Sequence, residues 1–163
     1  MTGPSERTRN HSQLGTALKT QGLDQGVALT LRTAGLKATS QRIAIALCLM
    51  NDESHPTAQE IFDRLRPGHP AMSFATVYNT LAALTAIGHC RKLVVGGATR
   101  FDPKTTVHHH AVCDRCGAVR DVAAGAETTP RALPGGFAVT RVERIYRGLC
   151  SACQKARRSK SKD

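Results

Sequence analysis

The stretch that decides the fold runs from residue 73 to residue 101 and reads SFATVYNTLAALTAIGHCRKLVVGGATRF. Its first part predicts a helix with Ser73 as N-cap and Gly88 as its end. One face of this helix is expected to be apolar: Phe74, Val77, Leu81 and Leu84. The second part predicts a β-hairpin, because two glycines separate two short strand-like segments and a two-residue hairpin turn needs positive φ.

Three more helices are predicted upstream, from apolar residues that recur at helical spacing. The first ends at Gly35, the second follows Thr39, and the third opens with the capping-box sequence Thr57-Ala58-Gln59-Glu60. The residues expected to face inward are Val27, Leu31 and Ala34, then Ile43, Ala46, Leu47 and Met50, then Ile61, Phe62 and Leu65. Short helices followed by a hairpin predict a winged helix-turn-helix, whose last helix enters the major groove of DNA.

The chain becomes strand-like after residue 103, with strands expected over 108–113, 117–123 and 137–149. The predicted fold class is therefore α+β, with an N-terminal winged helix-turn-helix domain followed by a small α/β domain. We expect the boundaries to be a mobile N-terminal extension (1–22), the winged-helix domain (23–102), the α/β domain (103–153) and a basic C-terminal tail (154–163).

The charge balance favours a polyanionic partner such as nucleic acid, because Lys and Arg outnumber Asp and Glu by 23 to 12, a net charge of +11. The charge does not locate the interface, since residues 154–163 alone hold five basic residues against one acidic residue. The longest apolar run, Ile43 to Met50, is too short to cross a membrane, and no secretion signal is evident. We therefore expect a cytoplasmic protein with no membrane partner and with reduced cysteines.

Two C-x2-C pairs stand out, Cys113-Asp-Arg-Cys116 and Cys150-Ser-Ala-Cys153. Each pair can bring two sulfurs to one ion, and together they complete the tetrahedral S4 set that Zn²⁺ prefers in closed, structural sites. The alternative, a thioredoxin-type redox pair, fits poorly because that chemistry needs only one pair at a helix start. Cys48 is expected in the core, and Cys90 has no assigned role.

The run His108-His109-His110 predicts a second metal site. On a strand, the first and third histidines share one face while His109 points to the other. Asp121 on the neighbouring strand and Asp102 at the domain junction could add oxygen ligands, and such a mixed set suits Fe²⁺ or Mn²⁺. Two alternatives stay open here: a solvated histidine run, and a catalytic zinc in a hydrolase, although no HExxH helix or evident general base is present.

Taken in order, these motifs resemble the Fur (ferric uptake regulator) family of dimeric, metal-dependent bacterial transcription regulators. The resemblance covers roughly residues 23–153. The matching elements are Gly35-Leu36-Lys37-Ala38-Thr39-Ser40-Gln41-Arg42, His55-Pro56-Thr57-Ala58, Ser73 to Leu81, Arg100-Phe101-Asp102, the three histidines and both cysteine pairs.

The resemblance implies a homodimeric repressor, not an enzyme, that binds a double-stranded DNA operator through its winged-helix domain and dimerises through its α/β domain. It implies a structural zinc held by Cys113, Cys116, Cys150 and Cys153. It implies a regulatory Fe²⁺ or Mn²⁺ held by His55, Asp102, His108, His110 and Asp121; His55 enters by resemblance alone. The candidate DNA contacts, which combine helix and wing residues with nearby cations, are Arg42, Ser73, Thr76, Tyr78, Asn79, Arg91, Lys92 and Arg100.

Within the family, the chain is most like the peroxide-sensing (PerR-like) branch, since Asp102 and Asp121 stand where iron sensors tend to have glutamate and Asn79 follows Tyr78. That branch implies iron-catalysed oxidation of a ligand histidine, His55 or His108, and control of oxidative-stress genes. An iron- or zinc-responsive uptake regulator is the alternative. The histidine run also resembles the haem-linked iron regulator (Irr-like) branch, which typically lacks the cysteine pairs present here.

Overall fold

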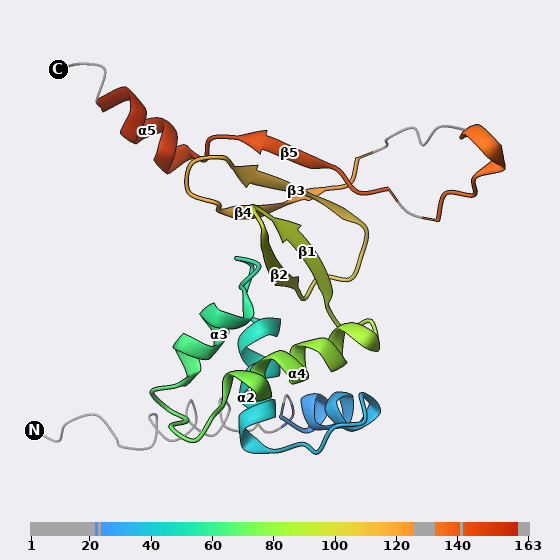
Figure 1. Cartoon of the computed structure of the whole chain (residues 1–163), viewed down its shortest axis with the longest axis vertical. Helices are drawn as coiled ribbons and strands as arrows, with labels where there is room; N and C mark the ends of the chain where they lie inside the picture. Colours follow the sequence, from blue (N-terminus) through green and yellow to red (C-terminus); the bar gives the residue numbers. More distant parts are fainter. Residues whose placement is uncertain (1–21, 23, 126–132, 141, 160–163) are drawn as a thin grey trace, which may run out of the picture.

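The computed structural model describes residues 22, 24–125, 133–140 and 142–159 (Figure 1). The predicted N-terminal extension lies outside these residues except for Gly22. The helical part consists of a first helix over residues 24–33, α2 (Ser40–Met50), α3 (Ala58–Leu65) and α4 (Phe74–Ala86). The remaining elements are β1 (Arg91–Val95), β2 (Ala98–Asp102), β3 (His108–Cys113), β4 (Val119–Ala123), the short 3-10 helix η1 (Pro134–Gly136), β5 (Ile145–Gly148) and α5 (Ser151–Ser159).

The helices form one hydrophobic core, as the sequence predicts for a helix-turn-helix unit. Val27, Leu31, Ile61, Val77 and Leu81 are all at most 3% exposed and lie in one packed cluster. Most of the predicted inward-facing residues of the first helix, α3 and α4 do lie in or against this core. The α4 face opposite this core, which carries Tyr78 and Asn79, is left exposed.

Two of the inward-facing predictions are wrong. Met50 is 56% exposed, and α2 instead buries Ile45, Ala46 and Leu49. The segment Ile43 to Met50 is apolar on every side, so its periodicity does not fix which face turns inward. Phe74 is 43% exposed at the start of α4, where its ring meets the edge of Phe62 with centroids 6.0 Å apart.

The predicted turn chemistry is confirmed at the β1–β2 hairpin. Gly96 and Gly97 both have positive φ, 61° and 78°, and Val95 pairs with Ala98 across the turn. In Figure 1 the hairpin stands between the helices and the three-stranded sheet. It contacts both, because Phe101 of β2 belongs to the helical core while Leu93 and Val95 of β1 pack on the sheet in a second small cluster.

The C-terminal sheet has the strand order β4-β3-β5, with β3 antiparallel to β4 and parallel to β5. The strand expected over 137–149 is shorter than predicted, because pairing with β3 begins only at Ile145, opposite His110. The preceding described residues form η1 and irregular chain that has no neighbouring strand in the described part of the structure.

The expected C-terminal tail is partly helical. Helix α5 includes residues 154–159, and its first turn is closed by the Gln154 amide donating to the Cys150 carbonyl at 2.9 Å. Lys, Arg, Gln and Ala are strong helix formers, so the composition that gives this segment its charge also favours a helix. No helix in the described ranges is long and apolar enough to cross a bilayer.

The capping box of α3 gives a stability prediction. Thr57 Oγ1 accepts from the Glu60 amide at 3.1 Å, and Glu60 Oε2 accepts from the Thr57 amide at 2.7 Å. Thr57→Ala is expected to lower the free energy of unfolding by about 1 kcal/mol in urea titrations at fixed zinc content. Thr33→Ala is the control, because Thr33 only donates to Leu29 within its own helix and should cost nothing. Equal losses in the two variants would contradict the capping role.

Candidate metal centres

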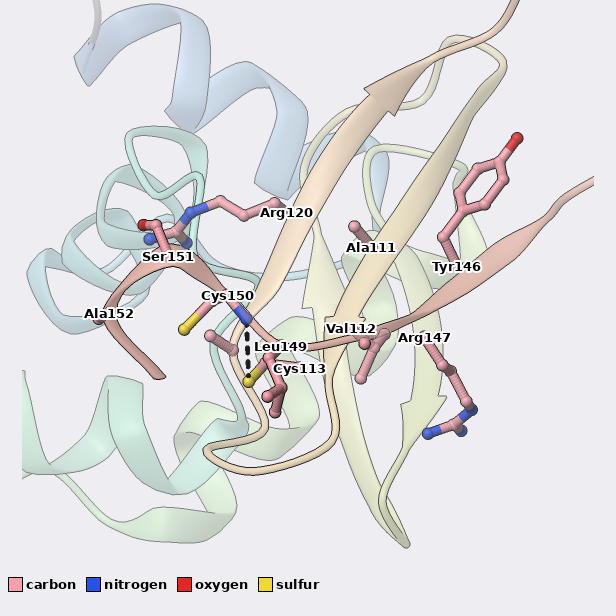
Figure 2. Close-up of a pocket in the computed structure, with 12 residues that line it drawn as sticks. Ala111, Val112, Cys113, Arg120, Tyr146, Arg147, Leu149, Cys150, Ser151 and Ala152 are labelled. Carbon is pink, nitrogen blue, oxygen red and sulfur yellow. Dashed lines mark hydrogen bonds between the residues drawn. The ribbon is translucent and has the colours of Figure 1, made fainter. Parts of the chain in front are cut away.

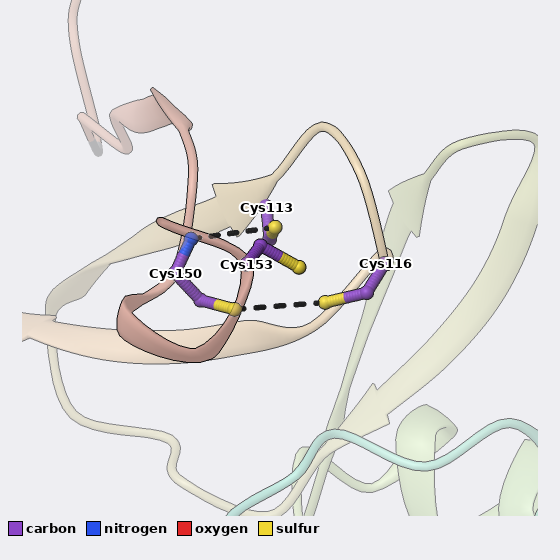
Figure 3. A group of neighbouring side chains, drawn as sticks. All are labelled: Cys113, Cys116, Cys150 and Cys153. Atoms are coloured by element: carbon purple, nitrogen blue, oxygen red, sulfur yellow. Dashed lines mark hydrogen bonds between the residues drawn. The ribbon is translucent and has the colours of Figure 1, made fainter. Parts of the chain in front are cut away.

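The four cysteines of the two C-x2-C pairs meet at the end of the sheet (Figure 3). Cys113 ends β3, Cys116 lies in the turn before β4, and Cys150 and Cys153 lie at the start of α5. Their four sulfur atoms all lie within 4.8 Å of one another. Each C-x2-C pair therefore brings two sulfur atoms to the same place. The 33 residues between the pairs contain β4 and β5.

The sulfur geometry fits a tetrahedral ion and not a disulfide. Cys116 Sγ lies 3.7 Å from Cys150 Sγ, close to the edge of about 3.8 Å that Zn–S bonds of about 2.3 Å produce in a tetrahedron. A disulfide would need about 2.05 Å, and all six cysteines are free. Amide N–H groups of Cys150 and Cys116 lower the pKa of Cys113 to about 6, which favours the thiolate that binds metal.

Burial and hydrogen bonds from the neighbouring thiols raise the pKa of Cys153 to about 12. In the metal-free cluster, protons therefore remain on part of the thiol set, and a bound divalent ion would replace them. A hollow of about 430 Å³ lies beside the cluster, where β3, β5 and the start of α5 meet (Figure 2). Because Cys113 and Cys150 themselves line it, this hollow borders the cysteine cluster and is not a separate site.

The second group joins side chains from both parts of the molecule. His55 lies in the segment before α3, and Asp102 ends β2 at the junction between the helical part and the sheet. His108 and His110 share one face of β3, and Asp121 lies opposite His110 on β4. The structure thus brings together all five residues named for the regulatory site.

Their donor atoms converge on a small volume. His55, His108, His110 and Asp121 each offer one atom within 4.8 Å of the others. Asp102 Oδ2 lies 3.1 Å from His108 Nε2 and 3.6 Å from His110 Nε2. His55 Nε2 lies 2.8 Å from Asp121 Oδ1 and 3.7 Å from Asp102 Oδ1. Three imidazoles and the Asp121 carboxylate can therefore share one cation, with the Asp102 carboxylate beside all three histidines.

Several of these atoms are buried without a hydrogen-bond partner in the described structure: both ring nitrogens of His55, Nδ1 of His110 and Oδ2 of Asp102. The 2.8 Å approach of His55 to Asp121 is close but is not aligned as a hydrogen bond. Buried polar atoms are almost always satisfied, because leaving one unpaired costs roughly 1–3 kcal/mol. Two of these atoms, His55 Nε2 and Asp102 Oδ2, face the other members of the group, and leaving them unsatisfied by the protein fits a divalent cation.

Electrostatics prepare the ligands for a cation. Burial, followed by the nearby His108 and His55, lowers the pKa of His110 and keeps it neutral, the form that binds metal. Burial raises the pKa of Asp121, but the hydrogen bond from Lys104 and the adjacent histidines outweigh burial and lower it overall. Both shifts favour the protonation states that a metal ligand needs.

Lys104 is a residue near the site that the sequence did not single out. Its ammonium Nζ lies 3.2 Å from Asp121 Oδ2, and its backbone amide donates to Asp102 Oδ1 at 2.8 Å. Only its position two residues after Asp102 could have indicated it. The side chain of Asp121 is 31% exposed while the three histidines are almost fully buried, so the group opens to solvent beside Asp121 and Lys104.

The other histidine and cysteines lie outside both groups. His109 points to the opposite face of β3, where its Nδ1 accepts from the Arg144 amide at 3.3 Å. Cys90 is 1% exposed in the helical core, within 3.2 Å of Thr85 Oγ1. Cys48 is half-buried on α2 and packs against the same core, as expected.

The candidate DNA contacts fall into two sets. Tyr78 and Asn79 are exposed on α4, and Lys92 Nζ lies 5.9 Å from the centroid of the Tyr78 ring. Ser73 caps α4 by accepting from the Thr76 amide, and Arg42 donates to the Lys37 carbonyl at 3.1 Å. These residues lie on the helix, at its start, on the hairpin or at the start of α2.

Arg91 and Arg100, the other two candidates, each donate hydrogen bonds to the protein's own backbone. The Arg91 guanidinium donates to the carbonyls of Thr105 and Thr106 in the segment between β2 and β3. The Arg100 side chain is only 17% exposed and donates to the His55 carbonyl at 3.0 Å. Strand alternation turned both side chains toward neighbouring protein segments, which the sequence alone does not show.

The chain is similar to known transcription regulators in both sequence and fold. The profile of the Ferric uptake regulator family matches residues 33–132. The peroxide-responsive repressor PerR of Staphylococcus aureus (strain Mu50 / ATCC 700699) is 36% identical over 136 residues, which are 81% of this chain and 91% of that protein. The solved ferric uptake regulator Fur of Helicobacter pylori shares the fold at a TM-score of 0.62 and 19% identity, over 82% of this chain and 93% of that one.

A solved zinc uptake regulator in complex with zinc and DNA also shares the fold, at a TM-score of 0.56 and 24% identity over 85% of this chain and 97% of that one. The fold and the two ligand groups define a winged-helix protein with two places for metal. The chain belongs to the ferric uptake regulator family. It is accordingly a metal-dependent transcription regulator and not an enzyme, which removes the hydrolase alternative.

The cysteine cluster gives a direct prediction. Cys116→Ser and Cys153→Ser should each lose one zinc ion per chain and should lower the melting temperature. The zinc content of the purified protein is measured by elemental mass spectrometry. Cys48→Ser is the matched control, because this thiol lies outside the cluster and should leave the zinc content unchanged. Full zinc content in both cluster variants would show that these sulfurs do not hold the ion.

Proposed function

We propose that the chain is a homodimeric, peroxide-responsive repressor whose regulatory metal is Fe²⁺ or Mn²⁺ and whose structural metal is Zn²⁺. The observation that carries this proposal is the convergence of five donor side chains, three of them histidines and two of them aspartates, from both parts of the molecule. Two aspartates with three histidines suit Fe²⁺ or Mn²⁺ better than tetrahedral zinc. The identity to peroxide-responsive repressors of Staphylococcus supports the sensing role.

The regulatory residues couple metal binding to domain arrangement. His55 belongs to the helical part, whereas His108, His110 and Asp121 belong to the sheet, and Asp102 lies between them. All five can reach one ion only when the two parts are held as they are here. A ligand that binds one arrangement shifts the population toward it. A coupling of about 3 kcal/mol would change operator affinity roughly 150-fold.

The exposure pattern supports a reaction with peroxide at this group. Iron held by the three histidines and two aspartates would supply one-electron chemistry with peroxide beside the ligand side chains. Peroxide can approach beside Asp121, which is the exposed member of the group. The rings of His55 and His108 are 1% exposed and lie next to the Asp121 carboxylate. Addition of oxygen to His55 or His108 would remove a donor nitrogen from use, so the two parts would separate and DNA would be released.

DNA recognition is assigned to α4 and the hairpin. Tyr78 and Asn79 face outward for contact with base edges, and Thr76 lies at the start of the helix near the expected phosphates. Lys92 and Arg42 supply cations for the DNA backbone. Ser73 supports the helix N-terminus. Oxidative-stress genes are the proposed targets, and the cytoplasm is the proposed location.

The homodimer is assigned to the sheet. β5 is an edge strand in the described sheet, and Ile145 and Tyr146 on it are each 44% exposed. An exposed edge with apolar side chains is a template for pairing with another strand. We propose that a second copy of this chain covers it, which would place two α4 helices in one assembly. An iron- or zinc-responsive uptake regulator remains the second candidate, because zinc and iron regulators share this fold.

Operator binding with different ions separates the two candidates. The protein loaded with Fe²⁺, Mn²⁺ or Zn²⁺ is titrated onto operator DNA, with and without peroxide, by fluorescence anisotropy. Peroxide should abolish binding only in the iron sample, and peptide mass spectrometry should then find one added oxygen atom on a peptide that contains His55 or His108. Binding that survives peroxide in the iron sample, with no oxygen added, would favour the uptake regulator.

A further inference from the structure

His55 adopts a backbone conformation that its residue type rarely takes. Its φ is +56°, and it is the one non-glycine residue with positive φ in the described ranges. Left-handed backbone is uncommon outside glycine, and such strain is retained where surrounding contacts impose it. The same residue is 1% exposed, and neither of its ring nitrogens has a hydrogen-bond partner within the described structure. Contacts with neighbouring segments must therefore hold the His55 backbone in this conformation, with the ring facing the other ligands.

The contacts that hold it come from β2. Arg100 Nη1 donates to the His55 carbonyl at 3.0 Å. The next amide, that of Phe101, donates to the Pro56 carbonyl at 2.9 Å, and Thr57 forms an isolated antiparallel bridge with Arg100. The segment His55-Pro56-Thr57 is therefore attached to β2 one residue before Asp102, another member of the group.

The guanidinium of Arg100 also contacts the carboxylate of Glu60. Nη1 lies 3.4 Å from Glu60 Oε2, the oxygen that also accepts from the Thr57 amide at 2.7 Å in the capping box. Arg100 thus lies between a backbone carbonyl and a carboxylate, at 17% exposure. Charge-assisted hydrogen bonds of this kind are stronger and more directional than neutral ones. Both contacts are made by Nη1, while Nε of the same guanidinium is buried without a hydrogen-bond partner in the described structure.

We propose that Arg100 is the positioning residue of the regulatory metal site, holding His55 in its left-handed conformation so that the imidazole faces the other four ligands. This inference rests on the proposed metal-binding role of the group. Arg100 itself is not a ligand: its partners are the His55 carbonyl and the Glu60 carboxylate, not the donor atoms of the group. It also connects the site to α3, because Glu60 belongs to that helix.

The test measures Mn²⁺ affinity of zinc-loaded protein, from the electron paramagnetic resonance signal of free Mn²⁺, in the variants Arg100→Gln, Arg100→Lys and Glu60→Gln. We expect a loss of about 10–100-fold for Arg100→Gln, the range typical of residues that orient metal ligands. Arg100→Lys should recover part of the affinity, because an ammonium can still reach the His55 carbonyl. Glu60→Gln keeps the capping box and should lose less. Arg64→Gln is the matched control, since this guanidinium also pairs with a carboxylate, that of Asp52, and neither residue belongs to the metal-binding group.

A double-mutant comparison separates positioning from general loosening of the fold. If Arg100 acts through His55, then Arg100→Gln should lower Mn²⁺ affinity in the wild-type background and add nothing in a His55→Ala background. Zinc content and the urea midpoint of the manganese-free protein report on folding, and if Arg100→Gln does not fold, the lysine and Glu60 variants decide the outcome.

Wild-type Mn²⁺ affinity in Arg100→Gln, or equal losses in both backgrounds, would overturn the positioning role and leave the proposed function standing. Equal Mn²⁺ affinity in wild type and His55→Ala would instead refute the proposed metal site itself.

Discussion

The structure depends on one constraint: five polar side chains are turned toward one small volume, and both ring nitrogens of His55 and one oxygen of Asp102 find no hydrogen-bond partner in the described structure. His55, His108 and His110 are almost fully buried, and the carboxylate of Asp102 is buried with them. In a protein interior such an arrangement costs free energy unless a cation occupies it. Because the donors come from the helical part, the junction and the sheet, a cation bound there would also fix how those parts are arranged.

The remaining features follow from that constraint. The β1–β2 hairpin contacts the helical core through Phe101 and the sheet through Leu93 and Val95, so it packs against both parts that the five residues join. The cysteine cluster lies at the other end of the sheet, where a tetrahedral ion would have no open ligand position. In the proposed function, zinc in that cluster holds the sheet together, and the regulatory metal holds the sheet and the helices in one arrangement.

The sequence predicted those elements whose cause is local. The Thr57–Glu60 capping box, the Gly96-Gly97 turn and the two C-x2-C pairs depend on neighbouring residues, and each is present as expected. His108 and His110 share a face because a strand alternates. The long-range features were not predictable from local pattern: the position of His55 needed the family resemblance, and the inward turn of Arg100 depends on a segment 45 residues away. The prediction of the buried face of α2 was wrong in part, because the segment from Ile43 to Met50 is apolar on every side and its pattern does not single out one face.

If metal in the five-residue group and DNA on α4 select the same arrangement, then each must strengthen the binding of the other. Mn²⁺ affinity should be measured with and without saturating operator DNA, alongside operator affinity with and without Mn²⁺. DNA should tighten Mn²⁺ binding by the same factor by which Mn²⁺ tightens DNA binding. Mn²⁺ affinity that is unchanged by operator DNA would contradict a shared arrangement.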